Sequence, residues 1–217
     1  MHKSITNLDL IDNILKTEIS SKEKPSVIAV SKTFPMSEIL PLINHGHIHF
    51  GENKVQEALE KWTTIKDDFK HIKLHMIGKL QTNKVKYVIP LFDYIHSLDN
   101  YKLAEKISSE QKKINKKLKI FIQINIGNES QKSGILSNEL EKFHLKCVSE
   151  LELDIIGLMC LPPKNKDSKI YFNEMKNLAD KLNLNNLSMG MSNDYLEASK
   201  NGSTHLRIGS KIFGERN

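Results

Sequence analysis

The chain of 217 residues suffices for one large domain or two small ones, and 39% hydrophobic with 27% charged residues is ordinary for a soluble globular protein. No stretch approaches the ~18 consecutive apolar residues of a membrane span, so we expect no membrane partner. The net charge of +6 raises the question of nucleic acid, but only Arg207 and Arg216 of the 32 basic residues are arginines. Because recognition of phosphates and bases relies on arginine, we expect no nucleic-acid partner.

The chain begins with an amphipathic stretch and continues as eight short apolar runs, each followed by helical or loop sequence. The opening stretch carries acids within an apolar pattern, which predicts a helix over about residues 6–19 rather than a signal peptide. Short runs rich in Val and Ile are typical of buried strands. The eight runs lie at residues 27–31, 47–50, 73–77, 92–97, 119–126, 153–159, 186–190 and 204–208.

The segments between these runs carry helical patterns. Val55, Ala58 and Trp62 recur at spacings of three and four, which predicts a helix, with Asn53 and Gln56 as its capping pair. The short intervals after the last two runs predict brief helices there. Strands that alternate with helices indicate a parallel sheet, and eight units in ~200 residues favour a single (β/α)₈ TIM barrel spanning 1–217. A flavodoxin-like or Rossmann sheet is the alternative, but no G-x-G-x-x-G follows the first run.

In such a barrel the carboxyl ends of the strands carry the functional residues, and two of these ends predict a phosphate site. The loop after the seventh run holds Gly190 and Ser192, and the loop after the eighth holds Gly209 and Ser210. Glycine permits close backbone approach, and a hydroxyl adds a donor for an anion. Singly, each is also explained as a turn glycine or a helix cap. Together, at the two loops where barrels bind phosphate, they favour a phosphate site.

Lys32 ends the first run, and the first strand of a closed barrel lies beside the eighth. A lysine there serves as a counter-charge to phosphate or as a Schiff-base amine. Pyridoxal 5′-phosphate (PLP) carries both a phosphate and an aldehyde, and so accounts for both features. Arg207 would then clamp the phosphate or face the pyridine nitrogen. Facing the pyridine nitrogen, Arg207 would leave that nitrogen unprotonated, because arginine keeps its proton. The ring would then be a poor electron sink.

Seven segments carry a resemblance to a known family. They are VIAVSKTFP, HFGENKVQE, HMIGKLQTNKVK, IHSLDN, IQINIGNESQKSGI, IIGLMCLPP and LSMGMSNDYLEASKNGSTHLRIGSKIFGER. In this order, over nearly the whole chain, the sequence resembles the pyridoxal-phosphate homeostasis proteins (the YggS/PROSC family). The resemblance implies a barrel like the N-terminal domain of alanine racemase, with PLP bound covalently to Lys32 and Arg207 near the pyridine nitrogen. It further implies that Ser192, Gly209 and Ser210 contact the phosphate and that Asn53 is a residue of the pocket.

The sequence departs from this family's pattern at three lysines. Lys79 stands where the family usually has proline, Lys54 replaces a common tyrosine and Lys86 replaces a frequent arginine. All three lie in predicted loops or helix starts, so the departures bear on loop shape and surface partners more than on cofactor binding. The lysines also leave room for a second PLP adduct at the surface.

The resemblance implies a protein that buffers or delivers PLP, and the residues favour this over catalysis. Racemisation on PLP needs a base on each face of the substrate, and racemases, by the same resemblance, take the second from a tyrosine in an added C-terminal domain. The sequence ends nine residues after Ile208, and Tyr195 is expected to pack within a helix. We therefore expect a monomeric carrier whose partners are PLP and apo PLP-dependent enzymes. An amino-acid racemase and a Schiff-base sugar-phosphate lyase are the alternatives.

The other reactive residues are interpreted as structural rather than functional. Two cysteines are too few for a disulfide framework, which indicates a cytoplasmic protein, and Cys160 is expected to pack as a small buried hydrophobe. His45, His47 and His49 alternate along one strand face, but no cysteine or carboxylate completes a metal site there. The polar loop at 127–134 is either a mobile lid or a long solvated connection.

Overall fold

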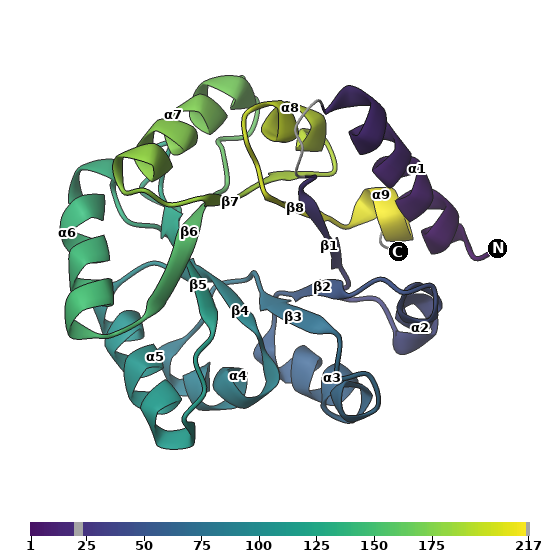
Figure 1. The fold of residues 1–217 in the computed structure, drawn as a ribbon, viewed down its shortest axis with the longest axis horizontal. Coiled ribbons are helices and arrows are strands. Elements are labelled where there is room, and N and C mark those ends of the chain that lie inside the picture. Colours follow the sequence, from purple (N-terminus) through teal and green to yellow (C-terminus); the bar gives the residue numbers. More distant parts are fainter. Residues whose placement is uncertain (20–23, 216–217) are drawn as a thin grey trace.

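Eight parallel strands close into a barrel in which the first strand pairs with the eighth (Figure 1). The structure is a computed structural model and describes residues 1–19 and 24–215. It confirms the predicted barrel rather than the open sheet, and each strand overlaps one predicted run. The strands are β1 (Ser26–Val30), β2 (His49–Glu52), β3 (Lys73–Met76), β4 (Tyr94–Leu98), β5 (Lys119–Ile124), β6 (Asp154–Cys160), β7 (Asn186–Met191) and β8 (His205–Ile208).

Helices form the outer ring of the barrel (Figure 1). The predicted first helix begins at Lys3 and ends at Glu18, and the helices after β7 and β8 are short, as predicted. None of the helices in the described part of the chain is long and apolar enough to cross a membrane. The helices are α1 (Lys3–Glu18), α2 (Met36–Asn44), α3 (Val55–Asp68), α4 (Val85–Leu91), α5 (Tyr101–Ile114), α6 (Leu140–Leu145), α7 (Ser168–Lys181), α8 (Tyr195–Lys200) and α9 (Ser210–Phe213), with single turns at η1 (Thr82–Lys84), η2 (Ser137–Glu139) and η3 (Lys146–Glu150).

The predicted cap of α3 is wrong. Lys54 occupies the N-cap position with extended backbone and no side-chain cap hydrogen bond. The chain therefore runs one residue beyond Asn53 before the helix begins. Gln56 donates instead to Glu60 one turn along α3, at 3.1 Å. The α-helix still forms because Ala58 and Trp62 bury its apolar stripe.

The strands sort their side chains into two different environments, because successive residues point to opposite faces. Residues that face the helices, such as Ala29 and Phe50, belong to the main hydrophobic core. Tyr94, Phe121 and Met159 form a separate small cluster inside the barrel. The interior also holds buried polar side chains. His75, His96 and His205 contact the rings of that cluster, and Ser188 and Arg207 are hydrogen-bonded to them in turn, Ser188 to His96 and Arg207 to Ser188. The barrel interior is therefore far more polar than the layer around it.

Candidate functional site

Lys32 lies in a strained turn directly after β1 and is half-buried. The backbone N–H of Phe34 donates to the carbonyl of Ser31 at 3.1 Å, and between them Thr33 has φ of 69°. A β-branched residue at positive φ persists only where its surroundings hold it, and here Glu57 accepts from the Thr33 N–H. Strained backbone of this kind concentrates at functional sites. The turn thus supports a functional role for its lysine.

Charged side chains from α3 and β2 hold the Lys32 turn in place. Lys61 Nζ donates to the carbonyl oxygen of Ser31 at 2.9 Å. The same ammonium lies 2.7 Å from Glu52 Oε1 and 2.9 Å from Glu57 Oε1. Two carboxylates and a second lysine therefore fix the backbone that carries Lys32.

Glu52 is the centre of this network. Its side chain is fully buried, and Oε1 also accepts from Ser31 Oγ at 2.8 Å and from Trp62 Nε1 at 2.9 Å. The second carboxylate oxygen, Oε2, is buried and has no hydrogen-bond partner among the described residues. A buried carboxylate is costly unless it is paired, so the network depends on the charge of Lys61.

The two loops predicted to bind phosphate come together at the carboxyl ends of β7 and β8. The Ser192 hydroxyl, which is buried, accepts from the backbone N–H of Lys211 at 3.4 Å and so joins the two loops. Gly209 is buried as well and precedes α9, whereas Ser210, the first residue of α9, is exposed. The predicted phosphate residues thus share one corner of the barrel mouth.

The Lys32 turn adjoins that corner. β1 and β8 pair in parallel with Ile28 opposite Arg207, so Lys32 lies further towards the mouth than Arg207 does. The ring of Phe34 stacks on Phe213 of α9 with centroids 4.8 Å apart. Packing between the turn and α9 therefore brings the predicted amine and the predicted phosphate loops to the same part of the mouth.

Arg207 is buried inside the barrel below the mouth. Its Nη1 donates to the carbonyl oxygen and to the hydroxyl of Ser188, both at 2.6 Å, and Nη2 donates to the carbonyl of Cys160 at 2.8 Å. Burial lowers the pKa of Arg207, but a guanidinium keeps its proton in proteins. These bonds occupy at most three of the five N–H groups of an arginine, and the remainder can donate to a ligand.

Asn53 follows β2 at the mouth and is half-buried. A Cβ added to Gly78 would lie 2.3 Å from the Asn53 carbonyl oxygen, which is backbone and cannot move cheaply. The loops after β2 and β3 therefore approach closely only because residue 78 is glycine. This contact with Gly78 fixes the Asn53 backbone, in place of the predicted helix cap, which does not form.

Replacing Gly78 by alanine should push the Asn53 segment away from the mouth. We expect a loss of about 1–3 kcal/mol in the free energy of unfolding, the usual cost of forcing a methyl group into a packed site. Chemical denaturation measures this loss. Lys79→Ala at the exposed neighbouring position is the matched control and should leave the stability unchanged. An unchanged stability in Gly78→Ala would show that the two loops are not in tight contact.

The structure brings the predicted residues to four strand ends of one barrel face, with Arg207 deeper than the rest. It also shows contributors that sequence reasoning missed, above all Lys61, Glu52 and Ser188. Two signals pointed to them. Lys61 follows Glu57 by four residues on α3, the spacing of a helical ion pair. Glu52 lies two residues beyond the predicted run at 47–50, and an acid so close to a buried strand needs a charged partner.

Cys160 and Tyr195 are buried, as the sequence predicts. Cys160 is fully buried, and burial raises the pKa of its thiol to about 12, so it does not supply a thiolate nucleophile. Tyr195 is buried within α8, as predicted. Over residues 1–19 and 24–215, no cluster of three or more His, Cys, Asp and Glu side chains is arranged to hold a metal ion.

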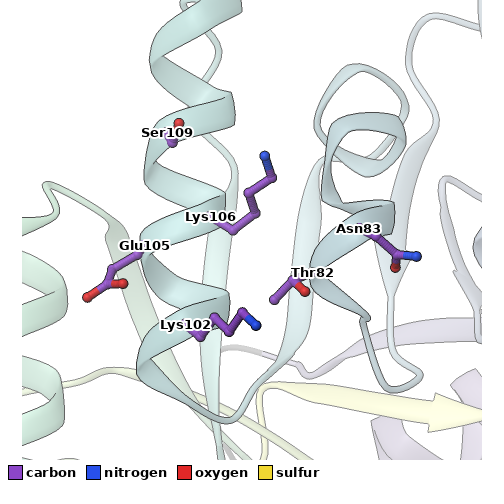
Figure 2. A pocket seen from close by; sticks show the side chains of 6 residues that line it. All are labelled: Thr82, Asn83, Lys102, Glu105, Lys106 and Ser109. Carbon is purple, nitrogen blue, oxygen red and sulfur yellow. The ribbon is translucent and has the colours of Figure 1, made fainter.

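A groove on the outer surface lies apart from these residues. Figure 2 shows Lys102 and Lys106 extending from α5 towards Thr82 at the start of η1, while Glu105 points to the other side of the helix. Asn83 and Ser109 complete the lining. All six side chains are exposed or half-buried, and none is a residue predicted for the site. A few solvated side chains of this kind do not form a built binding site.

Comparison with known proteins is consistent across the chain. Residues 7–217 match the family model described as alanine racemase, N-terminal domain. A pyridoxal phosphate homeostasis protein of Haemophilus influenzae is 37% identical over 226 residues, covering 97% of this chain and 95% of the relative. Another, from Aquifex aeolicus, is 37% identical over 199 residues, covering 88% and 86%.

A solved structure extends the similarity to three dimensions. PipY of Synechococcus elongatus, solved with PLP bound, superposes with a TM-score of 0.86 at 29% identity, over 97% of this chain and 100% of the other. The family model's range, residues 7–217, includes the Lys32 turn and the loops after β7 and β8. With its alanine-racemase-like barrel, this chain belongs to the family of pyridoxal phosphate homeostasis proteins.

Proposed function

We propose that this chain binds PLP at the mouth of the barrel as a Schiff base with Lys32, and that it buffers or delivers the cofactor in the cytoplasm. The observation that carries the proposal is the strained Lys32 turn beside the loops after β7 and β8. Three charged side chains, Glu52, Glu57 and Lys61, hold the strained turn at Thr33 in place. The turn carries Lys32 at the end of the barrel where barrels bind ligands. The PLP-bound relative supports the choice of cofactor.

The residues present fit PLP. Ser192 and Gly209 stand at a corner suited to the phosphate, with the Ser210 hydroxyl beside them. Arg207 retains N–H donors beyond its bonds to backbone and serine, and these suit the unprotonated ring nitrogen. Asn53 lines the mouth from β2. When bound, PLP supplies an aldehyde that captures amines.

Formation of the Schiff base requires a neutral Lys32 amine. Bound PLP would supply the aldehyde carbon to which Lys32 Nζ would bond, and the carbonyl oxygen would leave with both amine protons as water. No oxidant or second reactant is needed, and water reverses the step. Reversal is what a carrier requires, because the cofactor must leave again with its aldehyde intact.

The site favours a carrier over a racemase because its residues bind and orient rather than move protons. Arg207 cannot give a proton to the ring nitrogen, which keeps the ring a weak electron sink. Tyr195, the nearest tyrosine in sequence to the phosphate loops, is buried in α8 and cannot serve as a base facing Lys32. Incubation of the loaded protein with alanine in deuterated water should give no exchange at Cα. Rapid exchange would favour the racemase.

Lys32→Ala should abolish the covalent complex. We expect the wild-type protein to turn yellow with PLP and to yield, after borohydride reduction, a peptide modified at Lys32. The variant should give neither signal at that position. Lys79→Ala, which removes an exposed lysine of the mouth loops, is the matched control and should behave as the wild type. A modified Lys32 that transfers no PLP to an apo-enzyme would contradict the delivery role, and a wild-type protein that stays colourless would overturn the proposal.

A further inference from the structure

Three histidines and a serine form a continuous hydrogen-bonded chain through the barrel interior. His49 Nδ1 lies 2.9 Å from His75 Nε2, and His75 Nδ1 lies 2.9 Å from His96 Nε2. His96 Nδ1 lies 2.8 Å from Ser188 Oγ, which accepts from Arg207 at 2.6 Å. The residues come from β2, β3, β4, β7 and β8. The chain runs from His49, half-buried at the amino end of β2, to the arginine below the mouth.

The imidazoles of this chain are neutral at pH 7. Burial lowers the pKa of His75 and of His96 well below the ordinary value, and the neighbouring His205 and Arg207 lower that of His96 further. Burial also lowers the pKa of His49, whose charged surroundings are Lys73, Asp93 and Lys119. A neutral imidazole has one N–H and one acceptor nitrogen. Each ring that bonds on both sides must therefore donate on one side and accept on the other.

Arg207 decides the direction of the chain. Its Nη1–H occupies one lone pair of Ser188 Oγ, so this oxygen already accepts a hydrogen bond. If His96 also donated to Ser188, the serine proton would have no acceptor among the described residues. In the opposite direction Ser188 donates to His96, His96 donates to His75 and His75 donates to His49, so each of these bonds has one donor and one acceptor. All three histidines then carry the proton on Nε2.

Aromatic side chains enclose the chain. Tyr94 stacks on His75 with ring centroids 4.1 Å apart and planes inclined by 13°. Phe121 stacks on His96 with centroids 4.4 Å apart and planes inclined by 23°. Phe121 is fully buried, as are both of these imidazoles, and Tyr94 is nearly so. The low local dielectric strengthens each hydrogen bond and makes a broken one costly, so the chain resists rotation of any member.

We propose that His49, His75, His96 and Ser188 are positioning residues. The Arg207 cation polarises their hydrogen-bonded chain, and the chain in turn holds the Arg207 guanidinium towards the cofactor site. It links that site to the amino end of the barrel. The orienting role rests on the proposed function, since it assumes PLP at the mouth. The chain itself does not, because its direction follows from the protein's own groups. Nitrogen NMR of the protein without PLP can therefore test it separately.

Long-range ¹H–¹⁵N spectra of the uniformly labelled wild-type protein at pH 7 report the state of each imidazole. We expect His49, His75 and His96 to be neutral and protonated on Nε2. The same spectra of Ser188→Ala should change the nitrogen shifts of His96 first and most. A histidine of the three that is protonated on Nδ1, or charged, would overturn the polarised chain.

The orienting role is tested by two ligands, PLP and its 1-deaza analogue, in which CH replaces the ring nitrogen. Ser188→Ala should weaken PLP binding about tenfold, because it loosens a hydrogen bond to a charged group, and should weaken the analogue less than twofold. His205→Gln is the matched control, since His205 lies in the same interior but bonds to Thr204, and it should leave the ratio of the two affinities unchanged. Equal losses for both ligands would overturn the role. If the wild-type protein binds neither ligand, the proposed function fails with it, while the NMR result still decides the chain.

Discussion

Replacing Lys61 by methionine should lower the free energy of unfolding by about 3–5 kcal/mol, as is typical when one partner of a buried ion pair is removed. The variant leaves the Glu52 carboxylate fully buried, with one oxygen that already has no partner among the described residues. It also removes the donor to the Ser31 carbonyl, so the Lys32 turn loses its main support. Urea denaturation measures the first effect, and the yield of reduced PLP adduct at Lys32 measures the second.

A double variant separates charge from packing. Lys61→Met combined with Glu52→Gln removes both charges and keeps an acceptor for Trp62 Nε1, so it should recover much of the lost stability. Lys176→Met is the control for losing a lysine in an ion pair on a helix, because Lys176 and Asp180 are both about half-exposed. That control should cost less than about 1 kcal/mol. If Lys61→Met is as mild as the control, Glu52 is not the buried charge that the structure shows.

Acid should destabilise the folded protein from about pH 6.5 downwards. Burial lowers the pKa values of His47 and His205 to about 4 and holds those of His75 and His96 well below the ordinary value. In this window the four side chains stay neutral in the folded protein and take up protons in the unfolded chain. The unfolded state binds more protons, so the free energy of unfolding falls as the pH falls. These four histidines together give a limiting slope of roughly 5 kcal/mol per pH unit.

Denaturation curves between pH 6.5 and 5 measure this slope before carboxylates begin to titrate. His205→Gln should reduce it by about a quarter, because one of the four contributing groups is removed. His71→Gln, which replaces an exposed histidine, is the matched control. A wild-type slope near zero would mean that the interior histidines already share a proton in the folded state.

Local sequence patterns were enough to predict the framework of the protein. The eight strands were found because each apolar run is short and ends at a polar loop, and parallel strands of a barrel are buried on both faces. Lys32 and the two glycine-serine loops were found because barrel function is confined to one end of the strands. Arg207 stood out as one of two arginines in a chain rich in lysine.

The missed features depend on register and on which face of a strand a residue occupies. His49 stood out only within an alternating histidine stretch, and His75 and His96 not at all. Only the closure of the barrel places their nitrogens within hydrogen-bond distance. The predicted Asn53 cap failed for a similar reason, because its position is set by contact with Gly78 from the next loop. Local patterns do not encode such contacts, since the partners lie 21–26 residues apart or further.

The proposed site lies where β1 pairs with β8, the contact that closes the barrel. Lys32 follows the first strand and Arg207 lies on the last, so the ligand would bridge the two edges that must meet to complete the circle. A ligand that binds only the closed form stabilises it by mass action and slows the separation of those edges. A chain still emerging during synthesis, with β8 not yet made, has no such site. PLP is therefore expected to bind only after β8 has paired with β1 and closed the barrel.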